Sequence, residues 1–424
     1  MRKAASLMLK SAMWLGLICC SQVVSEQLMK SKEQRDTSPA VNEPDLAMLV
    51  AGNSAFAFDL YRTIRQMKTN LFFSPFSISE VLAMAYAGAR GDTKRAMAEA
   101  LHFNLPTDCL HPAFNSLDLQ FKERGQGAKG MDEEGFRLHV VNAIWGQKGY
   151  DFLAQFLDVL AQNYGAGLRI LDFINETEQS RVAINKWISD QTEERIKDLV
   201  PKGAIDQLTR LVLTNGIYFS AAWEFPFNKN STSDDIFHLM GDMDITIPLM
   251  QQTRSFRYAE GDRYQAVELA YDGHELSMLI LLPKVGEFDA FEGLLNAEFV
   301  REIIGKLELN EVVLTMPKFE YESSFGLKEA LSTLGMRGAF AGDADFSGMN
   351  GESDLSIQDV LHKAFVSVDE AGTKAAAATA VIMGMKLMPA LAIEMKIDRP
   401  FIFLVRDIPT DSIIFLGRVL NPAK

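Results

Sequence analysis

The sequence predicts an α+β fold, and three observations support this prediction. Helix-like spacing of apolar residues dominates the first part of the chain, whereas long apolar runs typical of strands dominate the second part. The two kinds of segment do not alternate regularly, as they would in a doubly wound parallel sheet. The chain has 424 residues, of which 48% are hydrophobic and 23% are charged, so it can bury a large core.

Residues 1–25 have the composition of an export signal peptide. Positively charged residues precede a short apolar run, Met13–Cys20, which is too short to span a membrane. Val23–Ser25 then offers a cleavage site before Glu26. The same residues also fit a lipoprotein signal that ends at Cys19 and leaves Cys20 to carry the lipid. We therefore expect a protein that is secreted or extracellular, periplasmic, or anchored to the cell envelope through Cys20.

The next segment, residues 26–45, is polar and is expected to be a disordered spacer. No second linker follows, so residues 46–424 are expected to form one domain. Outside the signal peptide the sequence has a single cysteine, Cys109, and an internal disulfide is therefore not expected in the mature chain.

Helical patterns mark three parts of the domain. Apolar residues share one helical face at Leu49, Phe56, Leu60 and Ile64. A short buried strand begins at Asn70, and Ser77-Ile-Ser-Glu80 then resembles a capping box that would begin a second helix. Residues 181–200 are expected to form a third helix.

Long strands are predicted mainly in the second half of the chain. The runs with strand composition are residues 210–227, 275–284, 310–323, 362–370 and 412–420.

The sequence does not contain the common motifs of an enzyme or a metal site. Its six histidines include no His-Glu-x-x-His pair, and no Cys-x-x-Cys, Gly-x-Ser-x-Gly or phosphate-binding Gly-rich motif occurs. The formal charge of −14 and the absence of a block of Lys and Arg argue against a nucleic-acid partner. We therefore expect no catalytic residues, no metal and no cofactor.

One segment does not fit an ordinary globular sequence: GTKAAAATAVIMGMKLMPAL, from Gly372 to Leu391. Four consecutive alanines are followed by an apolar run rich in methionine. A buried helix, a core strand and a membrane segment are three interpretations, although Ala375–Met385 has only 11 residues. The glycine before the run and Pro389 after it favour instead a long loop between two strands.

In an extended conformation, this segment has two faces that a sheet can accept. The first face would consist of Thr373, Ala375, Ala377, Thr379, Val381 and Met383, and the second of Lys374, Ala376, Ala378, Ala380, Ile382 and Gly384. The only charge falls on the second face, and every residue retains its backbone N–H. The segment can therefore enter a sheet without burying a charge or losing a ladder hydrogen bond.

The length of the segment also suits insertion. From Gly372 to Lys386 the extended chain spans about 50 Å at about 3.3 Å per residue. A single domain of this size has a diameter of about 50–55 Å. Insertion would therefore carry Lys386 across most of the molecule.

Several long motifs along the chain closely resemble the serpin family, and specifically its inhibitory members. Those around the unusual segment are DEAGTKAAAATA (Asp369–Ala380), IDRPFIFLV (Ile397–Val405) and FLGRVLNP (Phe415–Pro422). Further matches are NLFFSPFSI (Asn70–Ile78), LTNGIYFSAAWEFPF (Leu213–Phe227), ADFSGM (Ala344–Met349) and LHKAFVSVDE (Leu361–Glu370). They follow the family order from about residue 46 to residue 424.

The resemblance implies one domain with three β-sheets, eight or nine helices and an exposed reactive-centre loop. It also implies a function: suicide inhibition of a serine protease, in which the cut loop inserts into a sheet and the acyl-enzyme is trapped. The protein would be a protease inhibitor rather than an enzyme, and it would act as a monomer.

The resemblance assigns roles to individual residues. The reactive bond would lie between Lys386 and Leu387, which implies a trypsin-like target. The loop hinge would comprise Glu370, Gly372, Thr373, Ala375, Ala376, Ala377, Ala378 and Thr379. A polar shutter beneath the central sheet would comprise Ser74, Ser77, Asn215 and His362, and Trp223 would lie at the breach where the loop enters. A satisfied polar cluster and a plain core tryptophan are the alternative interpretations.

Two alternatives for the function stay open. The protein could be a non-inhibitory serpin, such as a carrier, chaperone or storage protein, although its hinge residues are small. Ala371 also replaces a charged residue that is common at that position. The target could instead be a chymotrypsin-like or elastase-like protease that cuts next to Met385, Leu387 or Met388.

Overall fold

Two sheets and ten α-helices form the part of the chain that the computed structural model describes, residues 26–125, 137–241, 243–373 and 392–423. The first sheet consists, in spatial order, of β1 (Gln27–Met29), β4 (Leu168–Leu171), β3 (Arg137–Gln147), β5 (Leu211–Ala222), β13 (Gly372–Thr373), β12 (Ile357–Val368) and β11 (Phe319–Gly326). The second consists of β14 (Ile393–Lys396), β10 (Glu308–Pro317), β7 (Met243–Glu260), β8 (Tyr264–Ala270), β9 (Leu276–Pro283), β15 (Phe401–Asp407), β16 (Ile413–Val419) and β2 (Leu71–Phe73), with β6 (Thr232–Leu239) paired to β7.

The helices lie around the first sheet and beside the second. They are α1 (Glu43–Ile64), α2 (Pro75–Tyr86), α3 (Gly91–Leu101), α4 (Thr107–Glu123), α5 (Ala154–Tyr164), α6 (Thr177–Gln191), α7 (Phe288–Leu294), α8 (Ala297–Gly305), α9 (Lys328–Thr333) and α10 (Ser347–Asn350). The arrangement confirms the predicted α+β class. None of the helices in the described residues is both long and apolar enough to cross a membrane.

The numbers of sheets and helices differ from those that the resemblance implies, for a simple geometric reason. Strand β7 has 18 residues and pairs with β6 near its start and with β8 at its end, so it joins two groups of strands into one sheet. The two shortest α-helices, α9 and α10, have only six and four residues.

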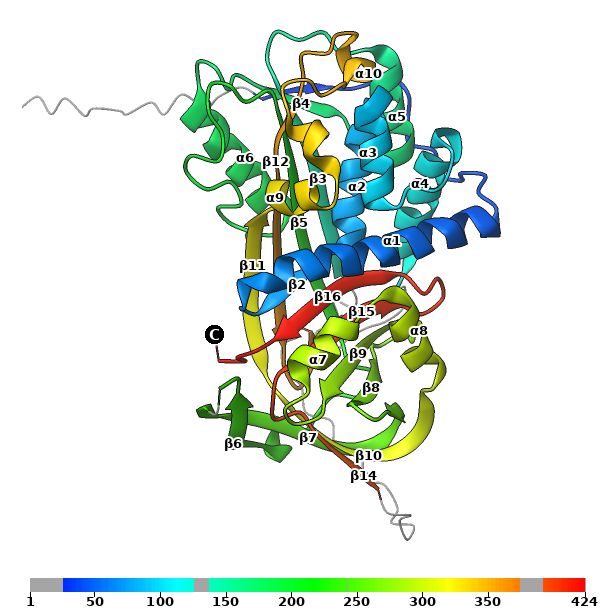
Figure 1. Cartoon of the computed structure of the whole chain (residues 1–424), viewed down its shortest axis with the longest axis vertical. Helices are drawn as coiled ribbons and strands as arrows, with labels where there is room; N and C mark the ends of the chain where they lie inside the picture. Colours follow the sequence, from blue (N-terminus) through cyan, green and yellow to red (C-terminus); the bar gives the residue numbers. More distant parts are fainter. Residues whose placement is uncertain (1–25, 126–136, 242, 374–391, 424) are drawn as a thin grey trace, which may run out of the picture.

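The long central strands of the first sheet lie between two helical layers. Figure 1 shows β3, β5 and β12 along the long axis, with α6 on one side and α2, α3 and α5 on the other. All twelve residues of β5 are buried. Gly216 in β5 faces α6, because a Cβ atom at this position would lie 3.4 Å from Ile188. The central strands are therefore covered on both faces, and their neighbours must move if a further strand is to enter.

Two helix boundaries differ from the sequence predictions. Helix α2 begins at Pro75, and the N-cap is Ser74, whose hydroxyl accepts a hydrogen bond from the backbone N–H of Ser77. The predicted capping box is therefore wrong, and Glu80 is bonded elsewhere. Helix α6 ends at Gln191 rather than continuing to residue 200, because Glu193 and the residue after it adopt positive φ angles of 50° and 59°.

The predicted strand over residues 310–323 divides into two strands of different sheets. Its first part, β10, pairs with β7 in the second sheet, whereas its second part, β11, pairs with β12 in the first sheet. The other predicted strands appear as β5, β9, β12 and β16.

The prediction that residues 26–45 are a disordered spacer is wrong. Gln27–Met29 form β1, the edge strand of the first sheet, which pairs antiparallel with β4. The backbone N–H of Asp36 donates to the carbonyl of Gln162 at 2.9 Å, and helix α1 already begins at Glu43. Specific hydrogen bonds to the folded domain therefore order a polar sequence that lacks the apolar periodicity used to predict structure.

Candidate functional site

The predicted hinge enters the first sheet between β5 and β12. Thr373 pairs with Ala221 of β5 on one side and with Val368 of β12 on the other, and both pairings are antiparallel. Beyond this point β5 and β12 pair directly with each other, in parallel. The hinge residues Ala375, Ala376, Ala377, Ala378 and Thr379 and the bond between Lys386 and Leu387 lie outside the described residues. The described part of the predicted hinge is therefore held between β5 and β12.

Gly372 is required by the close approach of β5. Its φ angle is 155°, and a Cβ atom at this position would lie 2.2 Å from the carbonyl oxygen of Ala221. Any other residue would clash with this backbone atom, so the glycine in the hinge motif has a direct steric reason.

Thr373 is hydrogen-bonded to one of two stacked aromatic side chains at the predicted breach. Its hydroxyl is hydrogen-bonded to the Tyr271 hydroxyl at 2.8 Å, and Tyr271 stacks on Trp223 with ring centres 4.7 Å apart. The indole N–H of Trp223 donates to the carbonyl of Asp369 at 3.0 Å. Burial raises the pKa of Tyr271, so its hydroxyl stays neutral. Trp223 therefore contacts the predicted hinge directly and is not only a residue of the apolar core.

Glu370 holds the start of the predicted hinge through an ion pair in which only the glutamate is buried. Its carboxylate lies 3.0 Å from the ammonium of Lys318 and accepts a hydrogen bond from the Thr232 hydroxyl at 2.8 Å. Burial opposes ionisation, but the hydrogen bonds from Lys318 and Thr232 lower the pKa of Glu370 overall. Ala371 is only 4% exposed, so a small residue suits this position.

The structure brings the four predicted shutter residues together beneath the central strands. The Asn215 amide donates to the Ser77 hydroxyl, and its oxygen is hydrogen-bonded to Nδ1 of His362. Ser74 is linked to them through the backbone N–H of Ser77. Asn215 and His362 face each other across the β5–β12 pairing. Their hydrogen bond therefore joins β5 and β12 directly.

Two members of this cluster, Asn142 and Glu80, were not predicted from the sequence. The Asn142 oxygen accepts from the Asn215 amide, and the Asn142 amide donates to Glu80 at 2.7 Å. Asn142 lies in the apolar run HVVNAIWG, where a polar residue is unusual for a buried strand. This polar residue within an apolar run was the only sequence signal for Asn142.

His362 makes the stability of the sheet depend on pH. Burial lowers its pKa to about 3, from an ordinary value near 6.5. Between these two values the unfolded chain binds more protons than the folded protein, so stability is highest above about pH 6.5 and falls as the pH falls toward about 3. At about 1.4 kcal/mol per pKa unit, the loss amounts to a few kcal/mol.

We therefore expect His362→Gln to flatten the pH dependence of unfolding over this window, because glutamine retains hydrogen bonding but does not titrate there. The measurement is the urea midpoint of both proteins at intervals between about pH 4 and pH 7, so that other titrating groups cancel in the difference. An identical slope in the two proteins would show that His362 binds its proton equally well in the folded state.

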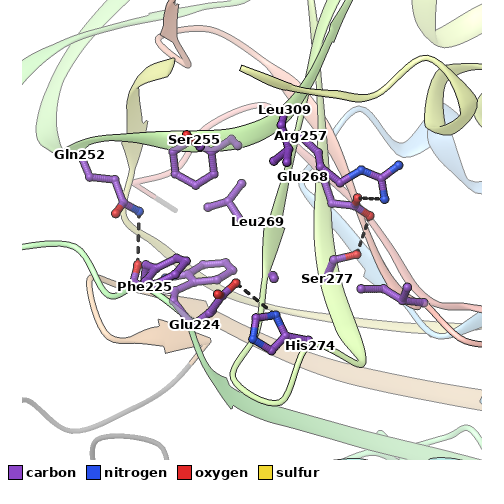
Figure 2. Close-up of a pocket in the computed structure, with 14 residues that line it drawn as sticks. Glu224, Phe225, Gln252, Ser255, Arg257, Glu268, Leu269, His274, Ser277 and Leu309 are labelled. Atoms are coloured by element: carbon purple, nitrogen blue, oxygen red, sulfur yellow. Dashed lines mark hydrogen bonds and ion pairs between the residues drawn. The ribbon is translucent and has the colours of Figure 1, made fainter. Parts of the chain in front are cut away.

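A pocket of about 240 Å³ adjoins the breach, and its side chains do not form a catalytic pair (Figure 2). The Ser277 hydroxyl donates to Glu268 at 2.7 Å, whereas His274 lies 3.4 Å from Glu224. Ser277 and His274 therefore interact with different carboxylates and not with each other. Among the described residues no group of three His, Cys, Asp or Glu side chains could hold a metal ion.

Comparison with known proteins identifies the family. A model described as "Serpin (serine protease inhibitor)" matches residues 51–422. The chain belongs to the serpin family. An uncharacterized serpin-like protein of Thermococcus kodakarensis is 40% identical over 372 residues, which is 87% of this chain and 84% of that protein. The leukocyte elastase inhibitor of Bos taurus is 39% identical over 388 residues, covering 89% of this serpin and all of that protein.

Solved structures show the same fold. The crystal structure of the thermophilic serpin tengpin in its native state matches with a TM-score of 0.80 and 28% identity, covering 93% of this serpin and 97% of that chain. Human thyroxine-binding globulin complexed with its ligand matches with a TM-score of 0.79 and 28% identity, covering 89% and 99%. The predictions of the serpin fold and of a protease-inhibitor family member rather than an enzyme are confirmed.

Proposed function

We propose that this serpin inhibits a serine protease as a suicide substrate that is cut after Lys386. The observation that carries the proposal is the position of β13, where Thr373 already pairs with both β5 and β12. The hinge residues are small, the neighbouring strands are long, and the pairing at the entry point has the antiparallel geometry that further insertion would extend.

The register of β13 predicts where each later residue would lie. Continued insertion would place Ala375 opposite Phe219, and Ala378 opposite Gly216, which contacts α6. The small side chains on the second face of the loop would thus pass beneath that helix. A bulky residue there would collide with Ile188.

The same register brings Thr379 to the shutter. Counting from the pairs Thr373–Ala221 and Thr373–Val368 places Thr379 opposite both Asn215 and His362. Insertion would break the hydrogen bond between those two side chains, and the Thr379 hydroxyl would supply a new partner on the same face. The hydrogen bond between Asn215 and His362 would therefore hold β5 and β12 together until the inserted Thr379 replaces it.

Insertion exchanges one parallel pairing for two antiparallel ones, which releases free energy. About a dozen new ladder hydrogen bonds at about 1 kcal/mol net each give a total of order 10 kcal/mol. Burial of Val381, Ile382 and Met383 adds a few kcal/mol. The release of stored strain by loop insertion drives the switch, and the free energy involved is comparable to the stability of a whole domain.

The covalent step follows the ordinary chemistry of a serine protease. The protease serine oxygen attacks the carbonyl carbon of Lys386, and the bond to the nitrogen of Leu387 breaks. The serine proton passes through the protease histidine to that nitrogen, which leaves as a free amine. Insertion then carries the Lys386 ester across the molecule and distorts the protease, so hydrolysis of the ester stalls.

Lys386 favours a trypsin-like target, since its ammonium can pair with an aspartate in the primary pocket. Relatives named leukocyte elastase inhibitor favour a second candidate, an elastase-like or chymotrypsin-like protease. Such a protease would cut next to Met385, Leu387 or Met388. A non-inhibitory role is the third candidate, since one structural relative is a thyroxine-binding globulin, and the small hinge residues argue against it.

A panel of proteases tests these candidates. The serpin is mixed separately with trypsin, chymotrypsin and elastase, and the products are analysed by mass spectrometry. The proposal predicts a covalent adduct with trypsin and release of a C-terminal peptide that begins at Leu387. Adducts only with the other two proteases would favour the second candidate, and cleavage by all three without any adduct would favour a non-inhibitory serpin.

Export completes the proposal. Residues 1–25 lie outside the described residues, and their sequence supports a signal peptide. The mature protein is then a secreted monomer that begins at Glu26, or a lipoprotein that begins at Cys20. The intact mass of the protein purified from its source distinguishes the two.

A further inference from the structure

The pocket of about 240 Å³ beside Trp223 has aromatic walls and apolar side chains at its opening (Figure 2). Trp223 and Phe256 are 2% and 7% exposed and form buried walls. Phe225 and Leu309 also line the pocket, yet they are 36% and 75% exposed. Apolar side chains that are exposed together around a cavity are typical of a binding site. The walls therefore suit a flat apolar group.

The volume of the pocket limits the size of its ligand. Pockets for drug-sized ligands have volumes of about 300–1,000 Å³, and this pocket is smaller, at about 240 Å³. A lipid or a large ring system would not fit. One ring or two fused rings would fill the space.

Arg257 on β7 offers a positive charge to the pocket. One of its nitrogens lies 3.2 Å from Glu268, and its side chain is 42% exposed. Glu268 already accepts hydrogen bonds from Arg406 and from Ser277, each at 2.7 Å. A guanidinium has several N–H donors in a planar arrangement that matches a carboxylate. Arg257 can therefore bind a second carboxylate without leaving Glu268 unpaired.

A second cation, Arg254, lies at the aromatic wall of the pocket. Its guanidinium carbon is 3.8 Å from the centre of the Phe225 ring, which is a cation–π contact. The positive charge of Arg254 is thereby held next to the opening.

Two carboxylates are among the described residues that line the pocket, and both are compensated. Glu268 has the partners given above, and Glu224 lies 3.4 Å from His274. Burial raises the pKa of Glu224, whereas His274 and Arg254 oppose this rise because their positive charges favour the carboxylate. With Arg257 as a further cation, the balance of charge around the pocket favours an anion.

We propose that this pocket binds a small aromatic carboxylate. Its one or two rings would lie against Trp223 and Phe225, and its carboxylate would accept charge-assisted hydrogen bonds from Arg257. The proposal is independent of the proposed function, because it requires neither cleavage of the reactive bond nor insertion of the loop.

Three probes of the same shape and different charge test the proposal. Titration calorimetry on the full mature chain measures the binding of naphthoate, of the neutral alcohol naphthylmethanol and of the cation naphthylmethylammonium. We expect naphthoate to bind at least about tenfold more tightly than the alcohol, and the cation to bind more weakly than either. Equal affinity for the acid and the alcohol, or tighter binding of the cation, would overturn the proposal. Naphthoate that does not bind at millimolar concentration would overturn it as well.

Arg257→Gln tests the group that would hold the carboxylate. This variant should bind naphthoate about tenfold more weakly, whereas its affinity for the alcohol should change less than about twofold. Arg263→Gln is the matched control, because Arg263 lies directly before β8, is paired with Glu287 at 3.7 Å and does not line the pocket. It should change neither affinity by more than about twofold. An undiminished affinity of Arg257→Gln for naphthoate would overturn the proposal.

Leu309 provides a second test that leaves Arg257 in place. Leu309 on β10 is directly opposite Arg257 on β7, and directly opposite residues share one face of a sheet. Leu309→Glu therefore places a carboxylate beside the guanidinium, where it competes with the ligand, and Leu309→Gln has the same size without the charge. We expect the glutamate variant to bind naphthoate at least about threefold more weakly than the glutamine variant, with equal binding of the alcohol. Equal binding of naphthoate by the two variants would show that Arg257 does not hold the carboxylate.

Discussion

Replacing Thr373 with arginine is expected to turn the inhibitor into a substrate. Thr373 is fully buried, and its hydroxyl is hydrogen-bonded at 2.8 Å to the hydroxyl of Tyr271, whose ring stacks on Trp223. An arginine could not be buried in this apolar site, so residue 373 would leave the sheet of the uncut protein, and its return during insertion would carry a cost that slows that step. The cut loop would then remain outside the sheet while water hydrolyses the acyl-enzyme.

Each additional ~1.4 kcal/mol in the insertion barrier slows that step about tenfold. We therefore expect at least about ten times more inhibitor to be cut for each protease molecule trapped. The measurement is the ratio of covalent complex to cleaved serpin on a denaturing gel. Thr373→Ser is the matched control, because it keeps the hydroxyl and nearly the same size. An equal yield of complex from Thr373→Arg would show that insertion does not require residue 373 to be buried in the sheet.

Replacing Lys386 with glutamate is expected to abolish inhibition of trypsin. A carboxylate at this position would face the aspartate of the protease pocket, and a like-charge contact of this kind costs several kcal/mol. The association rate should fall by at least about a thousandfold. Lys386→Arg, which keeps the positive charge, should inhibit trypsin about as well as the natural chain. Unchanged inhibition by Lys386→Glu would mean that the reactive bond lies elsewhere.

The sequence predicted those parts of the fold that depend on local apolar patterns. The strands of the core and the first helical face were recognised because burial repeats along the chain with a regular period. The end of α6 was missed because Glu193 and Glu194 adopt left-handed angles without a glycine or proline to signal them. The ordered segment before α1 was missed because Arg35 and Asp36 depend on partners on α4 and α5.

The candidate site was predicted in part, and from family motifs rather than from spacing. Ser74, Ser77, Asn215 and His362 meet as the resemblance implied. The partners that complete the site, Asn142, Glu80 and Tyr271, were not predicted. Each of these residues contacts side chains that are distant along the chain. Such contacts cannot be inferred from a single sequence. Their contacts become visible only when the sheet and α2 are placed together.

The melting temperature of the cleaved protein tests the central claim most directly. The loop is cut within residues 374–391 by a protease that is not trapped, and the cut and uncut chains are heated side by side. If the loop enters between β5 and β12, a stabilisation of order 10 kcal/mol should raise the melting temperature by about 10 °C or more. An unchanged or lower melting temperature after complete cleavage would contradict the account.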